Sequence, residues 1–362
     1  MVPELLSELT TLRLGGPARA YLRCDSAAAV AEAVARCDAA GEPVLLVGGG
    51  SNLVIADAGF DGTVVHLAHD AVSIDGTVLT ADAGAVWDDV VAASVDAGLG
   101  GLECLSGIPG SAGATPVQNV GAYGVEVSAW LDAVELYHRA TGETAWVAPE
   151  TLGLAYRTSR LKQHEAPGAA GSTTAAGPAD VVLRVRFALT DGASAPIRYG
   201  ELARVLGVEP GGTVDPADAR RAVLDLRRGK GMVLDPADHD TWSVGSFFTN
   251  PVVPAATAAA TVRRIEEATG ESTPQYPAPD GVKLSAGWLI ERAGFHKGYD
   301  GGRPGVSLST KHTLALTNRG TGTTAELLGL AGEVRDGVFA RFGVELRPEP
   351  VLVGAELPPL RP

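Results

Sequence analysis

Two glycine-rich loops are the part of this sequence best suited to chemistry, because each offers backbone N–H groups that no side chain shields. The first, GGGSN at 48–52, follows the apolar run VLLV at 44–47. The second, GIPG at 107–110, opens a glycine-rich run that ends at 124. Clustered backbone N–H groups bind anions such as phosphates. Together the loops predict a ligand that carries phosphates, but glycine makes up 46 of 362 residues, so neither loop is decisive alone.

The standard nucleotide and hydrolase motifs are missing, which narrows the choice of ligand. A dinucleotide-binding Rossmann loop needs a third glycine where the sequence has Leu53, and its βαβ context with an acidic ribose ligand is missing too. A P-loop fails at Leu224, which stands where the first glycine before Gly229 and Lys230 would be. The sequence contains neither GxSxG nor HExxH. Kinase, serine hydrolase and zinc protease functions therefore lose their main support.

The charge balance argues against nucleic acid and anionic membranes as partners. With 29 Lys and Arg against 43 Asp and Glu, the formal net charge of −14 at pH 7 repels polyanions at long range. An anionic ligand therefore needs basic residues within its own site. The start of the chain has no signal-peptide pattern, and no segment approaches the length of about 18 uninterrupted apolar residues that a membrane span needs. We therefore expect a cytoplasmic protein.

The cysteines show no pattern that would bind a metal or build a disulfide framework. Cys24, Cys37 and Cys104 are odd in number and lack CxxC or Cys/His spacing. We expect buried, reduced thiols and no metal site. No feature of the sequence indicates an obligate protein partner.

The apolar patterning predicts an α+β protein and not a strict alternation of strands and helices. Helices are expected at 26–41, 86–98, 215–230, 254–262 and 324–343. Strands are expected at 18–24, 43–48, 53–57, 62–67, 133–138, 144–148, 180–189 and 344–354, with a hairpin at 72–84. Residues 164–180 are small, polar and rich in Pro and Gly, so we expect an exposed loop there.

A series of motifs along the chain resembles the UDP-N-acetylenolpyruvoylglucosamine reductases, flavoenzymes of bacterial peptidoglycan synthesis. Besides the two loops, they are TPVQNVGAYG at 115–124, AYRTSRLK at 155–162, YGEL at 199–202, GSFFTNPVV at 245–253 and YPAPDGVKLSAGWLIERAG at 276–294. GSFFTNP and VKLSAGWLI are specific to that family, whereas GGGSN is shared with the wider flavin-binding class related to vanillyl-alcohol oxidase. The resemblance runs from TTLRLGG to RPEPVLVG and so covers nearly the whole chain.

The resemblance implies the reduction of an enolpyruvyl ether of a UDP-sugar to a lactyl ether, with hydride from NADPH passing through FAD. Arg157 matches the cation that stabilises the enolate formed when hydride reaches the terminal vinyl carbon. Ser246 matches the proton donor to the neighbouring carbon, and Glu349 matches a third residue that assists proton movement or orients the reacting group. Without the resemblance, Arg157 would be a solvated strand residue and Ser246 a turn residue.

The resemblance also implies where FAD and its two partners bind. Because Ser51 stands where covalent flavoproteins often carry His, we expect non-covalent FAD, and we expect NADPH and the sugar nucleotide to use one pocket in turn. The expected FAD contacts are Gly48, Gly49, Gly50, Ser51, Asn52, Ile108, Pro109, Gly110, Thr115, Gln118 and Asn119. The expected substrate contacts are Tyr123, Tyr199, Arg227, Lys230, Asn250, Tyr276 and Lys283.

The matched positions leave some questions open. Tyr199 with Tyr276 indicates the longer, type I subgroup, but Lys230 is also what a solvated helix end would carry. Many relatives have Val and then a basic residue after the glutamate that Glu349 matches, whereas here Pro350 and Val351 follow, so a basic contact at 351 is in doubt. An oxidase of the wider flavin class and a nucleotide-sugar sensor without catalysis remain alternatives.

The motifs divide the chain into an FAD-binding module of two subdomains and a third, substrate-binding domain. The first subdomain is expected at 1–68 and the second at 69–210, with a C-terminal strand at 344–362 completing the second. The substrate-binding domain is expected at 211–343.

Overall fold

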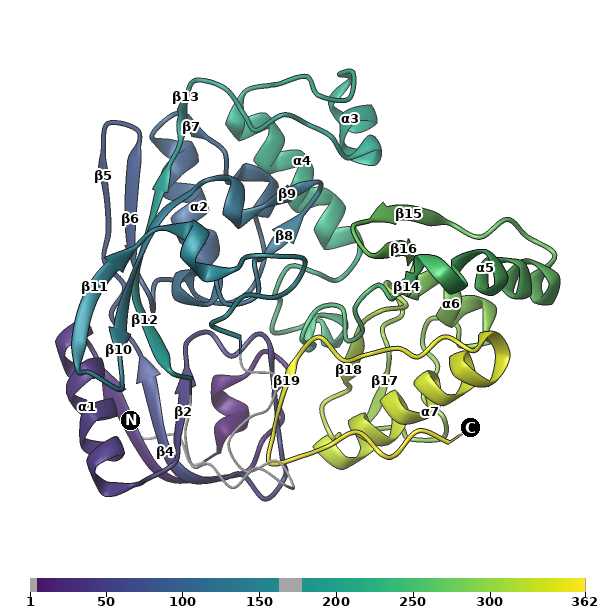
Figure 1. Cartoon of the computed structure of the whole chain (residues 1–362), viewed down its shortest axis with the longest axis horizontal. Coiled ribbons are helices and arrows are strands. Elements are labelled where there is room, and N and C mark those ends of the chain that lie inside the picture. The colour runs from purple at the N-terminus through teal and green to yellow at the C-terminus, as the bar shows by residue number, and fades with distance from the viewer. Residues whose placement is uncertain (1–4, 163–177, 362) are drawn as a thin grey trace.

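The computed structural model describes residues 5–162 and 178–361, so most of the loop predicted at 164–180 lies outside the described residues. In Figure 1 the purple-to-teal part of the chain lies on the left and the green-to-yellow part on the right, and the yellow segment before the C-terminus returns to the purple region. The helices predicted from the sequence are all present.

A small parallel sheet with one helix forms the first part of the chain. Its strands in spatial order are β1 (Ala18–Cys24), β4 (Phe60–Leu67) and β2 (Val44–Val47), with α1 (Ala27–Ala40) between β1 and β2 in the chain. The Ser26 side chain accepts a hydrogen bond from Ala29 N, and Gly41 ends α1 with a φ of 64°. Both caps follow from the residue types, because serine satisfies free N–H groups and glycine adopts positive φ cheaply.

The C-terminal strand completes this first part. The sequence had suggested instead that it completes the second part. β19 (Val351–Val353) pairs in parallel with β3 (Leu53–Ile55), which directly follows the first glycine-rich loop. The strand is also shorter than the predicted 344–354, because Pro348 and Pro350 have no N–H to give to a ladder. The pairing sets RPEP beside GGGSN.

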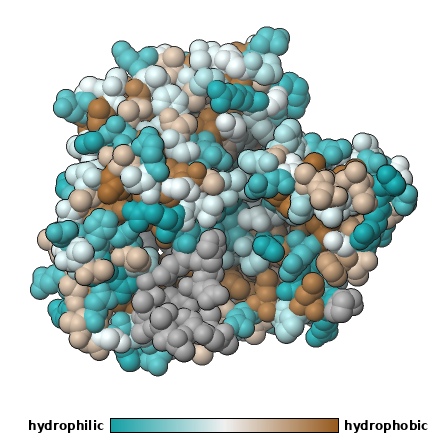
Figure 2. All heavy atoms as spheres, in the orientation of Figure 1, coloured by the Kyte–Doolittle hydropathy of each residue, from teal (hydrophilic) through white to brown (hydrophobic). Residues whose placement is uncertain are grey.

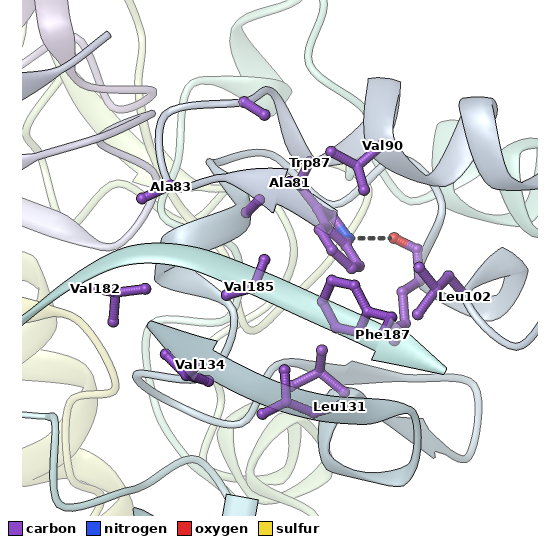
Figure 3. Packing of buried hydrophobic residues seen from close by; sticks show 14 of the residues in the cluster. Ala81, Ala83, Trp87, Val90, Leu102, Leu131, Val134, Val182, Val185 and Phe187 are labelled. Carbon is purple, nitrogen blue, oxygen red and sulfur yellow. Dashed lines mark hydrogen bonds between the residues drawn. The ribbon is translucent and has the colours of Figure 1, made fainter. Parts of the chain in front are cut away.

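An antiparallel sheet forms the second part. Its strands in spatial order are β11 (Glu143–Val147), β10 (Leu131–His138), β12 (Asp180–Ala188), β6 (Val78–Asp82) and β5 (Val72–Asp75). Short pairs join β7 (Leu99–Gly100) to β13 (Thr190–Asp191) and β8 (Gly121–Ala122) to β9 (Val125–Glu126). Trp87, the first residue of α2 (Trp87–Asp96), packs on Phe187 with ring centroids 5.6 Å apart and donates its indole N–H to Leu105 O at 3.1 Å (Figure 3). Burial of these aromatic rings fixes α2 on the sheet.

Two further helices, α3 (Gly200–Leu206) and α4 (Pro216–Gly229), pack on the second part, although the sequence had assigned α4 to the third domain. Ala219 and Val223 of α4 belong to the same buried cluster as Trp87 and Phe187. Asp88 in the first turn of α2 also accepts hydrogen bonds from Arg220 at 2.6 and 2.9 Å. A boundary near 210 would cut through this core. The other predicted domain limits stay predictions.

The Asp88 carboxylate is expected to stabilise the α2–α4 contact in a pH-dependent way. Burial would raise its pKa, but hydrogen bonds from Arg220 and Gly107 N hold the pKa below its ordinary value. Asp88→Asn should therefore cost about 1–2 kcal/mol of unfolding free energy at neutral pH. Because the pKa of Asp88 is lower in the folded protein than in the unfolded chain, where it is about 4, ionised Asp88 stabilises the fold above that pH. The stabilisation is lost as the pH falls through the folded-state pKa. The difference in unfolding free energy between the parent protein and Asp88→Asn should therefore shrink in acid.

Urea unfolding at two pH values measures this prediction. Asp89→Asn is the matched control, because Asp89 lies in the same first turn of α2 but is exposed. An equal loss of stability in both variants would show that the helix end, and not the Arg220 pair, is responsible.

The third part contains its own core. Its strands are β14 (Val252–Pro254), β16 (Gly281–Leu284) and β15 (Gln275–Ala278) in one sheet, with β17 (Val306–Leu308) and β18 (Leu316–Asn318) in another. Its helices are α5 (Ala255–Thr269), α6 (Ala286–Arg292) and α7 (Thr324–Phe342). Thr323 and Glu326 form a capping box at the start of α7, and Leu330 and Val334 are fully buried on its inner face. In Figure 2 the outline of the molecule is notched between the part that carries α3 and α4 and the part that carries α5.

Three other expectations concern the chain as a whole. Cys24, Cys37 and Cys104 are free and buried, as predicted. In 5–162 and 178–361 no helix is long and apolar enough to cross a membrane. Within the same ranges no group of three or more His, Cys, Asp and Glu residues could hold a metal ion.

Candidate active site

The two glycine-rich loops line one cavity of about 370 Å³. They are tied together by the Asn52 side-chain N–H, which donates to Gln118 Oε1 at 2.8 Å. Asn52 O in turn accepts from Val351 N at 2.9 Å, so the C-terminal strand joins the same wall. Segments from both ends of the sequence thus form one site, which we call the loop cavity.

The glycines of the first loop are needed for packing inside the protein itself. A Cβ atom on Gly49 would lie 2.7 Å from Gly110 Cα, so the two loops touch backbone to backbone. Gly50 has a φ of 56°, and a Cβ there would lie 1.8 Å from Leu9 O. At both positions a larger residue would force the loops apart. Glycine therefore allows the loops to meet, whatever ligand they hold.

Arg157 is placed in a tight turn and not in a strand. Ala155 and Thr158 bridge to each other across it, and Arg157 has a φ of 56°, which is uncommon for a residue other than glycine. Its Nη2 donates to Gly121 O at 2.7 Å, and only 22% of its side chain is exposed. The turn therefore holds the guanidinium against the second loop, facing the loop cavity, which Arg157 helps to line.

Ser246 and Glu349 are brought together by backbone pairing between GSFF and RPEP. Phe248 and Pro348 form an antiparallel bridge, and Glu349 N donates to Phe247 O at 2.9 Å. Ser246 precedes Phe247 directly in the chain, and both Ser246 and Glu349 line the loop cavity. The prolines on either side of Glu349 fix φ there, which restricts the direction of its backbone.

Arg157 and Glu349 form the charged centre of the site. Arg157 Nε lies 3.3 Å from Glu349 Oε1, and 13% of the Glu349 side chain is exposed. Burial raises the pKa of Glu349, and the positive charges of Arg157 and Lys162 only partly offset this effect. The Glu349 carboxyl can therefore hold a proton at a higher pH than an exposed glutamate does. A planar guanidinium beside such a carboxyl suits a ligand carboxylate that gains charge.

A second group of predicted residues meets at the start of α3 and the end of α4. The rings of Tyr123 and Tyr199 pack edge to face with centroids 5.4 Å apart, and Lys230 Nζ lies 5.8 Å from the Tyr123 ring centroid. Lys230 also donates to Glu201 Oε2 at 2.8 Å. Burial lowers the pKa of Lys230, but the Glu201 carboxylate outweighs it and the pKa is raised. Lys230 is therefore held in an ion pair and is not a freely solvated helix end.

A third group lies around Tyr156. Lys283 Nζ is 4.7 Å and Arg157 Cζ is 5.2 Å from the centroid of its ring, so the phenol has a cation near it from each of two segments. Tyr276 pairs with Lys283 between β15 and β16. Asn250 Oδ1 accepts from Ala286 N at 2.9 Å at the start of α6. These contacts bring the third part of the chain to the Arg157 turn.

Arg227 supplies a buried cation to the loop cavity. Its Nη2 donates to Met232 O at 2.7 Å and to Gly107 O at 3.3 Å, while its buried Nε has no partner among the described residues. Burial lowers the pKa of Arg227 to about 10, so the guanidinium stays charged at neutral pH. A buried cation with an unused N–H in a cavity wall fits an anionic group such as a phosphate.

Comparisons with known proteins identify the family. The FAD binding domain model matches residues 18–148, and the model of the UDP-N-acetylenolpyruvoylglucosamine reductase C-terminal domain matches residues 235–353. UDP-N-acetylenolpyruvoylglucosamine reductases of Saccharopolyspora erythraea and Mycobacterium tuberculosis are 60% and 54% identical, each match covering 97% of this chain and 95% of the relative. The chain belongs to the UDP-N-acetylenolpyruvoylglucosamine reductase family. The predicted resemblance is confirmed, and with it the assignment to the oxidoreductases.

The fold agrees with this family. A UDP-N-acetylenolpyruvylglucosamine reductase from Thermus caldophilus has a similar structure, with a TM-score of 0.64 over 96% of this chain and 97% of that chain. At 24% identity this likeness concerns the fold alone, and it confirms the predicted α+β class.

Most of the residues matched to the UDP-N-acetylenolpyruvoylglucosamine reductases gather at the loop cavity. It is lined by Gly48, Gly49, Gly50, Ser51, Asn52, Ile108, Pro109, Gly110, Thr115, Gln118, Arg157, Arg227, Ser246 and Glu349. Asn119 does not line it, because its amide is used inside the fold by Glu126, Ala155 O and Ser128 N. The Tyr199 and Tyr156 groups lie outside the lining, so the expected substrate contacts are divided among three places.

Three residues near the candidate active site were missed by the sequence analysis. Lys162 and Tyr156 lie inside AYRTSRLK and Glu201 lies inside YGEL, so the motifs were noted but these side chains were not. A buried lysine five residues after Arg157 is a signal only once the turn between them is known. Glu201 could have been suggested by the need of Lys230 for a counter-charge in the free protein.

Proposed function

We propose that this protein reduces UDP-N-acetylglucosamine enolpyruvate to UDP-N-acetylmuramate, with NADPH as hydride donor and non-covalent FAD as cofactor, in peptidoglycan synthesis. The observation that supports this most is that Arg157, Ser246 and Glu349 all line the loop cavity, with Arg157 and Glu349 in contact. Binding alone does not require a proton donor beside a buried carboxyl, which argues against a nucleotide-sugar sensor. A cytoplasmic location remains part of this proposal.

The residues of the loop cavity fit FAD. The backbone N–H groups of 48–52, Ile108 and Gly110 and the unpartnered Nε of Arg227 would hold its phosphates. Gln118 and Thr115, which line the same cavity, would contact the rest of the cofactor. When bound, FAD supplies the hydride that NADPH provides.

Arg157 and Ser246 would carry out the proton and charge work on the substrate. The Arg157 guanidinium would hold the substrate carboxylate and stabilise the negative charge that develops on it as hydride reaches the vinyl carbon. The Ser246 hydroxyl would then give its proton to the adjacent carbon. A serine hydroxyl is a weak acid, so this step requires close positioning, and the pairing of GSFF with RPEP supports such an arrangement.

Glu349 would restore the proton on Ser246 or orient the substrate carboxyl group. Burial raises its pKa, so it keeps a proton to a higher pH than an exposed glutamate does, although Arg157 is close by. Ser246 and Glu349 both line the loop cavity, and such a transfer would need them within hydrogen-bond reach, directly or through one water. Without a basic side chain at Val351, Arg157 and Lys162 are the cations nearest to this carboxyl.

The sugar nucleotide would be held by the other two groups. Lys230 with Tyr123 and Tyr199 suits the diphosphate, because Lys230 supplies a positive charge beside the Tyr123 ring, against which Tyr199 packs. Lys283, Asn250 and Tyr276 approach from the third part, beside Tyr156. In a chain with a net charge of −14, these local cations are needed to accept an anionic substrate.

Glu201 is expected to compete with the substrate for Lys230. The carboxylate bonds Lys230 in the free protein, and a phosphate must displace it. Glu201→Gln should lower KM for the sugar nucleotide by up to about fivefold, since a half-exposed ion pair is worth at most about 1 kcal/mol. Steady-state kinetics measures it, with exposed Glu209→Gln in the same region as control. A higher KM in Glu201→Gln alone would mean that Glu201 positions Lys230 for binding.

The order of binding tests the proposed reaction. If NADPH and the sugar nucleotide use one pocket in turn, initial-rate plots should be parallel, and excess enolpyruvyl substrate should inhibit. Intersecting plots, with no half-reaction when the sugar nucleotide is left out, would contradict a shared pocket.

A further inference from the structure

Lys162 lies directly behind the Arg157–Glu349 ion pair. Its Nζ donates to the backbone oxygen of Glu349 at 2.9 Å and reaches that of Arg157 at 3.4 Å. Lys162 lines a second cavity, of about 910 Å³, which Arg157 and Glu349 also line. It is not part of the lining of the loop cavity. Lys162 therefore contacts both residues from the side that faces away from the glycine-rich loops.

The backbone of Lys162 is anchored on the second glycine-rich loop. Its N–H donates to Ser159 O at 3.2 Å, and buried Ser159 donates its hydroxyl to Val117 O at 2.6 Å. Val117 lies between Thr115 and Gln118, both of which line the loop cavity. Through its backbone N–H, by way of Ser159, and through its ammonium group, Lys162 thus links the second loop, the Arg157 turn and the C-terminal RPEPV segment.

The Arg157–Glu349 contact needs such support. It is a single Nε to Oε1 approach of 3.3 Å and not a bidentate pair, so the ion pair alone fixes neither side chain firmly. Arg157 also has a strained positive φ, which persists only where surrounding contacts hold it. Hydrogen bonds from Lys162 to the two carbonyl oxygens hold both backbones at once.

The charge of Lys162 acts on the same carboxyl. Burial lowers the pKa of Lys162, the charge of Arg157 lowers it further, and Glu349 partly restores it. Conversely, Lys162 is one of two cations that oppose the effect of burial on Glu349. A buried ammonium is costly to keep, so a neutral residue would serve better if Lys162 only filled space.

We propose that Lys162 is a positioning residue of the reduction, which holds the backbones of Arg157 and Glu349 in register and supplies a second positive charge to the Glu349 carboxylate. The inference rests on the proposed function for its effect on catalysis. Its effect on Glu349 does not depend on which substrate is turned over. Lys162 acts from the second cavity and does not touch substrate.

The test compares Lys162→Met with Lys162→Arg in the FAD-loaded protein. Titration of ¹³C-labelled glutamate by NMR follows Glu349, whose resonance is identified by its loss in Glu349→Gln. Loss of a nearby positive charge should raise the Glu349 pKa by about 1 to 3 in Lys162→Met, and Lys162→Arg should bring it back most of the way. Lys162→Gln, which keeps a donor but removes the charge, replaces the methionine variant if that does not fold.

Kinetics of the same variants separates positioning from binding. The limb of the pH profile that belongs to Glu349 is the one that disappears in Glu349→Gln. In Lys162→Met this limb should move to higher pH. In the same variant kcat should fall by a larger factor than KM rises. Arg347→Met is the control, because exposed Arg347 lines the same second cavity two residues from Glu349. It should leave the titration of Glu349 and the pH profile unchanged.

Two results overturn the inference, and one result belongs to the proposed function alone. The first is a loss of stability in Lys162→Met and Lys162→Gln with the pKa of Glu349 and the pH profile of the kinetics the same as in the parent protein. Lys162 would then be structural only. If Arg347→Met shifts Glu349 equally, the effect is a general one of charge. If the parent protein does not turn over the enolpyruvyl substrate while Lys162→Met still shifts Glu349, the proposed function fails and the electrostatic role of Lys162 stands.

Discussion

Ser246→Ala is expected to leave reduction of the bound flavin by NADPH intact and to slow its reoxidation by the enolpyruvyl sugar nucleotide by about 10²- to 10⁴-fold, the usual contribution of a general acid. Ser246 lines the loop cavity, as Glu349 does, and alanine removes the side-chain proton that Ser246 can give. Arg157 and the loops are unchanged, so binding of cofactor and substrate should persist. Stopped-flow absorbance of the flavin separates the two half-reactions.

Thr249→Val is the matched control for this variant. Thr249 lies on the same segment and its hydroxyl reaches Arg347 O at 3.4 Å, but it lines the second cavity and not the loop cavity. It should reoxidise at close to the parent rate. Unchanged reoxidation in Ser246→Ala would show that another group, with Glu349 the first candidate, gives the proton.

Gly50→Ala should abolish stable FAD binding and destabilise the protein by about 2–4 kcal/mol. The new Cβ would meet Leu9 O at 1.8 Å, and backbone cannot move aside as a flexible side chain can. The positive φ of 56° adds a further cost for any residue with a Cβ. We expect a colourless protein after purification and an earlier unfolding transition.

Gly76→Ala distinguishes the clash from backbone strain. Gly76 has a φ of 58°, nearly that of Gly50, but a Cβ there would have nothing within 4 Å. It should lose about 1 kcal/mol at most and keep FAD. If Gly50→Ala kept FAD as firmly as Gly76→Ala, the contact between the first loop and residues 9–10 would have no part in forming the site.

Local signals in the sequence predicted the elements well. Ser26, Asp215 and Gly343 stand at ends of the helices expected at 26–41, 215–230 and 324–343 and cap them, because caps depend on residue type and position. The family motifs likewise predicted which segments would meet. GSFF and RPEP, about a hundred residues apart, are now seen to pair through Phe248 and Pro348.

Features that depend on tertiary contacts were beyond the sequence. The apolar face of α4 is compatible with either neighbouring core, and only the Asp88–Arg220 contact shows which one it joins. The glycines of GGGSN were expected to make room for a ligand, but their closest neighbours belong to the protein itself. Lys162 gave no signal, because its role depends on a turn at Arg157 that propensity does not indicate.

An anaerobic titration of the purified protein tests the central claim most directly. NADPH should bleach the flavin, and UDP-N-acetylglucosamine enolpyruvate should restore its oxidised spectrum without oxygen. When the titration is run in D2O, deuterium should appear on the carbon next to the carboxylate, because hydride adds to the terminal vinyl carbon and the neighbouring carbon takes its proton from the solvent-exchangeable Ser246 hydroxyl. A flavin that stays reduced until oxygen is admitted, with peroxide as the product, would contradict the account and favour an oxidase.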